Sequence, residues 1–318
     1  MMRLLAMLFL AVPLLAVAQD YPSKPIRMIV PYTAGGAADT VARAIGHKLG
    51  DLLGQPIVIE NRTGAGGMIG TDYVAKSAPD GYTLLSTLGP SHHTIQFFSK
   101  NVPYDPVKDF TAVMIVGTAP QTLVVPASLP VKSMTELVEY GKRNPGKLSF
   151  GTSGMGTSQH LGGLLLNLAT GIDMVHVPYK GGAAALNDVL GGQVQVGILV
   201  LSNVLPHIKA GKLRGLGVLE AKRAKGAPDI PTVGEAIRGY AIPETWAGIL
   251  GPAGLPAPVL SKLSGELIKA VNSPEVRSRL DGAGFEFVGS APKEFSELLS
   301  GSVDTYRKIV TEAGIKPE

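Results

Sequence analysis

Four stretches of this chain share one pattern, in which an apolar run typical of a buried strand ends at a glycine-rich turn and good helix formers follow. They read IVPYTAGGAADT from Ile29, IENRTGAGGMIG from Ile59, SFGTSGMGTSQH from Ser149 and VPYKGGAAALND from Val177. Strands that alternate with helices at this spacing predict βαβ crossovers and a parallel sheet. Because the stretches fall as two pairs in the two halves of the chain, we expect two α/β units of similar architecture.

The remaining periodic segments complete this prediction. Strands are expected at 26–30, 57–60, 84–88 and 113–117 in the first half, and at 148–150, 174–177 and 194–201 in the second. Two apolar segments flanked by Pro or Gly, 122–126 and 246–251, are expected to carry the chain between the halves. The tail predicts helices at 258–272, 274–283 and 292–313 and a short strand at 286–288. Two lobes joined by two crossings would form a hinged clamshell with its cleft between the facing loops.

The domain prediction follows from these crossings. Residues 1–18 combine one basic residue, an apolar core and small residues before Gln19, which is typical of a signal peptide cleaved near Ala18 and of an exported, periplasmic protein. A membrane anchor is the alternative, but the apolar core is short and Pro13 interrupts it. The first lobe is expected to comprise 19–122 plus 247–318, and the second lobe 123–246.

Composition narrows the classes of function. The chain of 318 residues contains no cysteine, which excludes disulfides, thiolate metal sites and cysteine nucleophiles. Its formal net charge of +4 is too small and dispersed to indicate nucleic-acid binding. The six histidines show no metal-ligand spacing, so no metal and no cofactor are expected. We expect a monomer.

The glycine turns predict anion binding, because glycine leaves room for a ligand and the first amides of a helix lack intrahelical partners. A carboxylate and a phosphate both fit this pattern. Spacing argues against nucleotide sites: Ile69 and Gln159 stand where the third glycine of a dinucleotide fingerprint is needed, and no Gly-Lys pair precedes Ser or Thr. Met155 likewise breaks a nucleophile elbow in GTSGM.

Individual polar residues have two interpretations each. Asp39 suits a structural role in the first turn of a helix, where a carboxylate bonds loop amides, more than a role as a general base. His92 is expected where a strand meets a loop, and His160 near the start of a helix; each is either packed or ligand-facing. Thr152, Ser153, Thr157 and Ser158 gather hydroxyl donors on one turn, which favours ligand binding.

At this point the chain resembles a known family. The motifs YPSKPIRMIVPYTAGGAADTVAR, IENRTGAGGMIG, PDGYTLL, YDPVKDF, TSGMGTSQHL, HVPYKGGAAALNDVLGGQV, IKAGKLRGLGV, DIPTVGEA and GPAGLPAPV are similar, in order and over almost the whole mature chain, to Bug-type substrate-binding proteins of tripartite tricarboxylate transporters. The resemblance implies a type II periplasmic binding protein fold, with two α/β lobes, two crossing strands and a ligand cleft between them. It also implies capture of a small carboxylate by backbone amides, hydroxyls and waters, and membrane transporter subunits as partners.

Carried over to this sequence, the resemblance implies a set of ligand-binding residues. From the first lobe these are Tyr32, Thr33, Ala34, Gly35, Gly36, Ala37, Asp39, Ser91 and His92, and from the second Thr152, Ser153, Gly156, Thr157, Ser158, His160, Leu201 and Ser202. Tyr32-Thr33-Ala34 replaces the aromatic and two prolines common in the family. Leu199 and Leu201 stand where polar groups often appear, and the pocket loops contain no arginine, so we expect a monocarboxylate or partly apolar acid rather than a citrate-like ligand.

Three functions remain as hypotheses. The first is a binding protein, without catalysis, that delivers a carboxylate to a membrane transporter. A sensor subunit that presents the ligand-bound form to a membrane signalling partner would share the same fold. An exported hydrolase would need a nucleophile with a base within reach.

Overall fold

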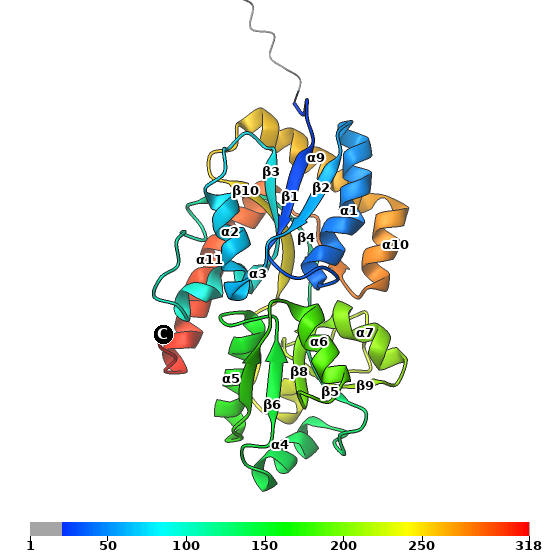
Figure 1. Ribbon diagram of the computed structural model, residues 1–318, viewed down its shortest axis with the longest axis vertical. Helices are drawn as coiled ribbons and strands as arrows, with labels where there is room; N and C mark the ends of the chain where they lie inside the picture. Colours follow the sequence, from blue (N-terminus) through cyan, green and yellow to red (C-terminus); the bar gives the residue numbers. More distant parts are fainter. Residues whose placement is uncertain (1–20, 318) are drawn as a thin grey trace, which may run out of the picture.

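The computed structural model describes residues 21–317, and the predicted signal peptide lies outside them. Two β-sheets lie one above the other, each with its own helices (Figure 1). We call the first sheet with its helices the first lobe, and the second sheet with its helices the second lobe. Among the described residues, no helix combines the length and apolar character needed to cross a bilayer.

The first sheet has six strands in the order β11-β4-β10-β3-β1-β2. Strands β1, β2 and β3 are mutually parallel, while β10 runs antiparallel to both β3 and β4, and β11 pairs antiparallel with β4. Their bounds are β1 Ile26–Val30, β2 Ile57–Asn61, β3 Thr83–Leu88, β4 Phe110–Thr118, β10 Trp246–Pro252 and β11 Glu286–Phe287.

The second sheet has five strands in the order β7-β6-β8-β5-β9. Strands β6, β7 and β8 are parallel, and β5 runs antiparallel to β8 and β9. Their bounds are β5 Gln121–Pro126, β6 Ser149–Thr152, β7 Val175–Pro178, β8 Val196–Val200 and β9 Leu213–Val218. Apart from β11, both sheets therefore place three parallel strands, one antiparallel strand and one further strand in the same order, which is the internal repeat that the glycine turns predict.

Helices cover both faces of each sheet. Their bounds are α1 Ala37–Leu53, α2 Met68–Ala75, α3 Gly89–Thr94, α4 Met134–Arg143, α5 Ser158–Thr170, α6 Gly182–Leu190, α7 Leu201–Lys209, α8 Val233–Ala236, α9 Ala257–Asn272, α10 Pro274–Gly282 and α11 Pro292–Glu312, with short 3-10 helices at Ala65–Gly67 and Ile95–Phe97. In the first lobe α1, α9 and α10 share one apolar core with the sheet, and α2 and the start of α11 share another. Successive strand residues such as Met28 and Ile29 enter opposite cores, as the alternation of a strand requires.

The chain passes between the lobes twice, from β4 to β5 and again just before β10. The segments predicted as crossings become the antiparallel strands β5 and β10, each within the sheet that the chain has just entered. Helix α11 adds a third link. The helix runs from the first lobe toward the second (Figure 1). Phe295 near its start belongs to a core of the first sheet, and its later residues Tyr306 and Val310 share an apolar cluster with Leu161 of α5.

Two local predictions are wrong. Leu201 is not the end of a strand but the first residue of α7, because its amide turns to bond the carbonyl of Pro120 while the apolar run continues without a break. An apolar run alone does not show where a strand stops and a buried helix starts. His92 lies in α3 and not where a strand meets a loop.

Candidate functional site

The first glycine turn joins β1 to α1, and its two glycine amides are already bonded within the turn. Gly35 lies in the left-handed region at φ +77° and donates its amide to Oδ2 of Asp39 at 2.9 Å. The amide of Gly36 donates to the carbonyl of Thr33 at 3.1 Å. The backbone amides of this turn that remain for a ligand are therefore the next two, those of Ala37 and Ala38. They have no intrahelical acceptor because they lie at the start of a helix.

Asp39 holds the turn in this shape. The side chain is only 2% exposed and accepts hydrogen bonds from Gly35, from Nε of Arg43 at 2.8 Å and from Nδ2 of Asn61 at 2.9 Å. Burial alone would raise the pKa of Asp39, but the hydrogen bonds from Arg43, Gly35 and Asn61 outweigh it and keep the pKa below its ordinary value. Asp39 is thus an ionised support of the loop, and its charge is compensated by Arg43.

The segment that faces this turn comes from the β7–α6 loop and from α7. The amide of Thr33 donates to the carbonyl of Lys180 at 3.3 Å, and Nδ2 of Asn203 donates to the carbonyl of Gly35 at 3.2 Å. A Cβ on Gly181 would lie 2.3 Å from Oγ1 of Thr33, so only glycine permits this approach. The N-terminal turns of α1, α6 and α7 therefore meet where the two lobes touch.

The β6–α5 turn, predicted to face the first turn, instead meets a different part of the first lobe. Oγ1 of Thr94 donates to the carbonyl of Gly156 at 2.5 Å. A Cβ on Gly66 would lie 2.2 Å from the carbonyl oxygen of Met155. The glycine turns thus form two contact zones of the interlobe interface, one at Thr33–Gly36 and one at the β6–α5 turn, while α11 joins the lobes elsewhere.

Within the β6–α5 turn, most polar groups bond one another. Thr157 caps α5, because its Oγ1 accepts from the amide of His160 and donates to the carbonyl of Gly154. The amide of Ser153 donates to Gln159, and that of Gly156 to Nδ1 of His160. The backbone donors left for a ligand are those of the first turn of α5, which starts at Ser158.

The predicted histidines are packed and uncharged. The rings of His160 and His176 stack at 3.9 Å, and Oγ1 of Thr152 lies 2.8 Å from Nε2 of His176. Burial lowers the pKa of His160 to about 4, and burial together with His160 lowers the pKa of His176 to about 3. Both rings are therefore neutral at physiological pH and offer a ligand no positive charge.

The α3 residues lie in the first-lobe core. His92 is 1% exposed, bonds the carbonyl of Pro106 and packs edge-on against Phe110. Ser91 is buried as well, and burial raises the pKa of Tyr32 to about 12, against the opposing effect of neighbouring hydroxyls. Tyr32 lies against Gly67 within its own lobe. These side chains are buried within the first lobe.

Two hydroxyls at the interlobe interface have no partner among the described residues. Oγ1 of Thr33 and Oγ of Ser202 are both buried and unbonded. Burying a hydroxyl without a hydrogen bond costs about 1–3 kcal/mol, so such atoms mark places where a ligand or water is bound. Leu201 and Leu199, in contrast, belong to the apolar core of the second lobe and do not support the expectation of an apolar ligand.

The positive charges near the interface are already paired or lie outside it. Arg43 is bonded to Asp39, and Lys180 contributes a backbone carbonyl while its residue as a whole is exposed. Ala34 is also exposed at the edge of the turn. In the described part of the chain no three His, Cys, Asp or Glu side chains gather as metal ligands. The site therefore offers amides and hydroxyls, which suit an anion that is recognised by hydrogen bonds.

Several residues of this interface lie outside the ligand-binding set that the resemblance implies. Asn203, Lys180 and Gly181 form the surface that faces the first turn, and Gly66 and Thr94 face the β6–α5 turn. Lys180 acts through its carbonyl, for which the residue type gives no signal. Gly66 and Gly181 both lie in glycine turns that the sequence analysis singled out, so the turns themselves were the available signal.

The fold and this interface define a class of protein, the two-lobed solute-binding proteins. The family model described as "Tripartite tricarboxylate transporter family receptor" matches residues 41–315, and the chain belongs to this family. Among sequence relatives, the UPF0065 protein of the tcbD-tcbE intergenic region of Pseudomonas sp. (strain P51) is 37% identical over 92% of this chain and 87% of its own. Protein BugT of Bordetella pertussis is 34% identical over 94% and 92%.

Solved structures agree with this assignment. The periplasmic binding protein BugD superposes with a TM-score of 0.89 at 34% identity, over 94% of this chain and all of its own. Rpa4515 of R. palustris, solved with adipate, gives the same TM-score, identity and coverage of both chains. MatC of Rhodopseudomonas palustris, solved with malate, gives 0.87 at 31% identity over 91% of this chain and all of its own. The type II periplasmic binding protein fold implied by the sequence is thereby confirmed.

Proposed function

We propose that this protein is an exported, periplasmic solute-binding protein that captures a small carboxylate between its lobes and delivers it to the membrane subunits of a tripartite tricarboxylate transporter. One observation carries the proposal: Asn203 and Thr33 bring the N-terminal turns of α1, α6 and α7 together across the interface. Three helix N-termini on one anion supply unpaired amides and favourable dipoles. The two relatives solved with dicarboxylates support the same ligand class.

The lobes in this proposal follow the two sheets, so the expected boundaries at 122/123 and 246/247 each move by one or two residues: β5, from Gln121, belongs to the second lobe, and β10, from Trp246, to the first. The carboxylate would bind to the amides of Ala37 and Ala38 and to the hydroxyls of Thr33 and Ser202, the last two being buried without partners. Since Arg43 is bonded to Asp39, no arginine of the turn is left for a bidentate pair. We therefore favour a ligand with few charges over a citrate-like one.

Thermal unfolding with a panel of carboxylates tests ligand capture. Adipate, malate, benzoate and acetate are compared with benzamide and adipamide, which have similar shapes and no charge. Stabilisation by an acid and not by its amide would support carboxylate capture, because a ligand that binds only the native state raises the unfolding temperature by mass action. Stabilisation by none of the acids at millimolar concentrations, or equal stabilisation by acid and amide, would refute it.

Uptake measurements test the delivery step separately. Spheroplasts washed free of periplasmic protein lose binding-protein-dependent uptake of a radiolabelled carboxylate that the panel has identified. We expect the purified protein to restore that uptake, and a variant that does not bind the acid to fail. If a binding-competent protein leaves uptake unchanged, delivery is excluded while capture stands.

A further inference from the structure

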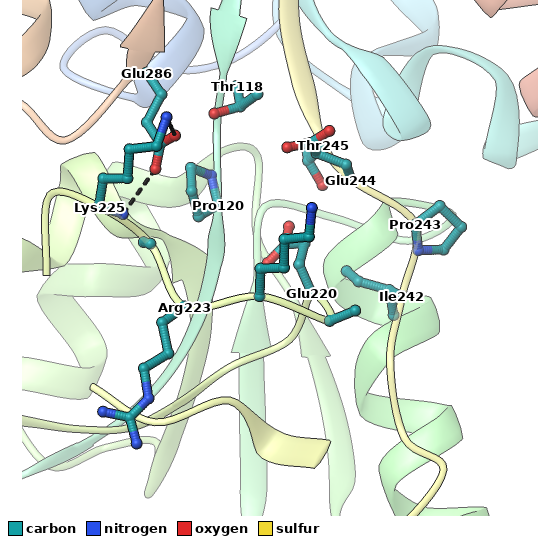
Figure 2. Close-up of a pocket in the computed structure, with 13 residues that line it drawn as sticks. Thr118, Pro120, Glu220, Arg223, Lys225, Ile242, Pro243, Glu244, Thr245 and Glu286 are labelled. Atoms are coloured by element: carbon teal, nitrogen blue, oxygen red, sulfur yellow. Dashed lines mark hydrogen bonds and ion pairs between the residues drawn. The ribbon is translucent and has the colours of Figure 1, made fainter. Parts of the chain in front are cut away.

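A cavity of about 390 Å³ opens on the two connections between the lobes, away from both contact zones of the interlobe interface. Its wall combines the β4–β5 connection, the segment before β10, the loop after β9 and the start of β11. The residues drawn in Figure 2 include Thr118, Pro120, Glu220, Arg223, Lys225, Ile242, Pro243, Glu244, Thr245 and Glu286. Nothing in the proposed ligand capture uses this cavity.

Glu220 is the buried acid of this wall. The residue is 7% exposed, and both of its carboxylate oxygens lie 3.1 Å from the amide of Gln121, the first residue of β5. Two backbone hydrogen bonds join the same segments. The amide of Leu219 donates to the carbonyl of Gln121, and the amide of Ile242 donates to the carbonyl of Leu219. Glu220 thus lies where the outgoing connection, the returning connection and the second lobe meet.

None of the charged groups around Glu220 forms an ion pair with its carboxylate. Glu244 precedes β10 and acts to raise the pKa of Glu220, while Lys225 is bonded to Glu286 of β11 and Arg223 to Glu235. The remaining groups are Lys222 in the same loop, Tyr240, and Tyr306 of α11. No ion pair to Glu220 exists among the described residues.

An ionised carboxylate is costly in this position. Burial raises the pKa of Glu220 to about 8, although the amide of Gln121 acts in the opposite direction. A buried acid without a counter-ion is favoured in its neutral form, and ionisation favours any arrangement that admits water to it. The adjoining cavity is the route by which the connections could separate and admit that water.

We propose that Glu220 is a proton-sensitive contact of the hinge: while its carboxyl is neutral, the segment at Leu219–Glu220 stays packed between the start of β5 and the returning connection, and ionisation of the carboxyl lets these segments separate and the lobes open. The direction of the pH effect follows from the linkage between protonation of Glu220 and closure of the lobes. A carboxyl that binds its proton more tightly in the closed form favours closure at low pH, and this preference is lost as pH rises through the pKa of the closed form.

Distance measurements between spin labels test this proposal without a ligand. The natural chain has no cysteine, so Val58→Cys on β2 and Val175→Cys on β7, at residues that are 43% and 55% exposed, place one label on each lobe. Between about pH 4 and about pH 9 we expect the longer-distance fraction to grow, because the preference for closure is lost between the ordinary pKa of a glutamate and the pKa of about 8 that Glu220 has in the closed form. A distribution that stays unchanged over this range would overturn the proposal.

Two further variants separate Glu220 from its surroundings. Glu220→Gln keeps the shape and the acceptor for Gln121 but cannot ionise, so it should remain closed at high pH. Glu244→Gln removes an exposed carboxylate from the same cavity wall; because Glu244 acts to raise the pKa of Glu220, this variant should keep a pH response that is displaced to lower pH. Equal responses in the parent and Glu220→Gln, or loss of the response in Glu244→Gln alone, would contradict the assignment to Glu220.

Discussion

Asn203 of α7 donates its side-chain amide to the carbonyl of Gly35, and this hydrogen bond crosses from the second lobe to the first. The carbonyl belongs to the turn whose next amides open α1. In the same turn, the amide of Thr33 donates a hydrogen bond to the carbonyl of Lys180. Closure of the lobes and the shape of the turn proposed to bind the anion are therefore physically coupled.

Asn203→Ala tests that coupling. A net hydrogen bond contributes about 1 kcal/mol, so carboxylate affinity should fall about fivefold in calorimetric titration, with a small change in unfolding free energy. Asn272→Ala is the matched control, since Asn272 donates to the carbonyl of Ile268 within the first lobe. An equal loss of affinity in both variants would show that the interlobe position of Asn203 is irrelevant.

Asp39→Asn tests the support of the first turn. The variant removes the charge that accepts from Gly35, Arg43 and Asn61, and we expect a loss of about 2–3 kcal/mol in denaturant unfolding at neutral pH. Because the folded-state pKa of Asp39 is depressed, its contribution is present above the unfolded pKa and is lost as pH falls through the folded value. The difference between parent and variant should therefore shrink in acid.

A matched acid on the surface separates this effect from a general loss of charge. Asp304 pairs with Arg307 on an exposed face of α11. Asp304→Asn should change stability by less than about 0.5 kcal/mol. A loss of similar size in Asp304→Asn, or a parent–variant difference for Asp39 that is independent of pH, would refute the assigned role.

Gly66→Ala tests whether the lobes need close backbone contact. Gly66 has φ +64°, and a Cβ there would lie 2.2 Å from the carbonyl oxygen of Met155 across the interface. Gly211→Ala provides the control, because Gly211 has φ +68° and open space around it. Both variants carry the strain of a left-handed alanine, about 1 kcal/mol, but only Gly66→Ala should enlarge the radius of gyration in X-ray scattering. Identical scattering from the two would exclude the contact.

Thr33→Val tests the unpaired hydroxyl. Removing a buried hydroxyl that has no partner should leave the ligand-free protein equally or slightly more stable, whereas the carboxylate complex should lose about tenfold in affinity. Thr305→Val, on the exposed face of α11, should change neither affinity nor closure. Unaltered affinity in Thr33→Val would remove this hydroxyl from the ligand site.

The sequence predicts local structure best where several signals coincide. The strand at 26–30 and the helix start at Ala37 agree with β1 and α1, because an apolar run, a Pro and two glycines mark the boundary together. The start of α7 carries no such mark, since Val200 and Leu201 are both apolar and buried. The pairing of turns across the lobes was not predictable either, because it is made by backbone groups of Lys180, Gly35 and Gly156 that are present in every residue.

The return of β10 to the first sheet, after the chain has formed the second, has a consequence for how the protein folds. Strand β10 lies between β3 and β4, yet nearly 130 residues separate its start from the end of β4. Because a chain is synthesised from its N-terminus, β3 and β4 are available long before the strand that must pair with both. We therefore expect the first sheet to remain incomplete until most of the second has formed, so that the two halves fold as one cooperative unit rather than in order of their appearance.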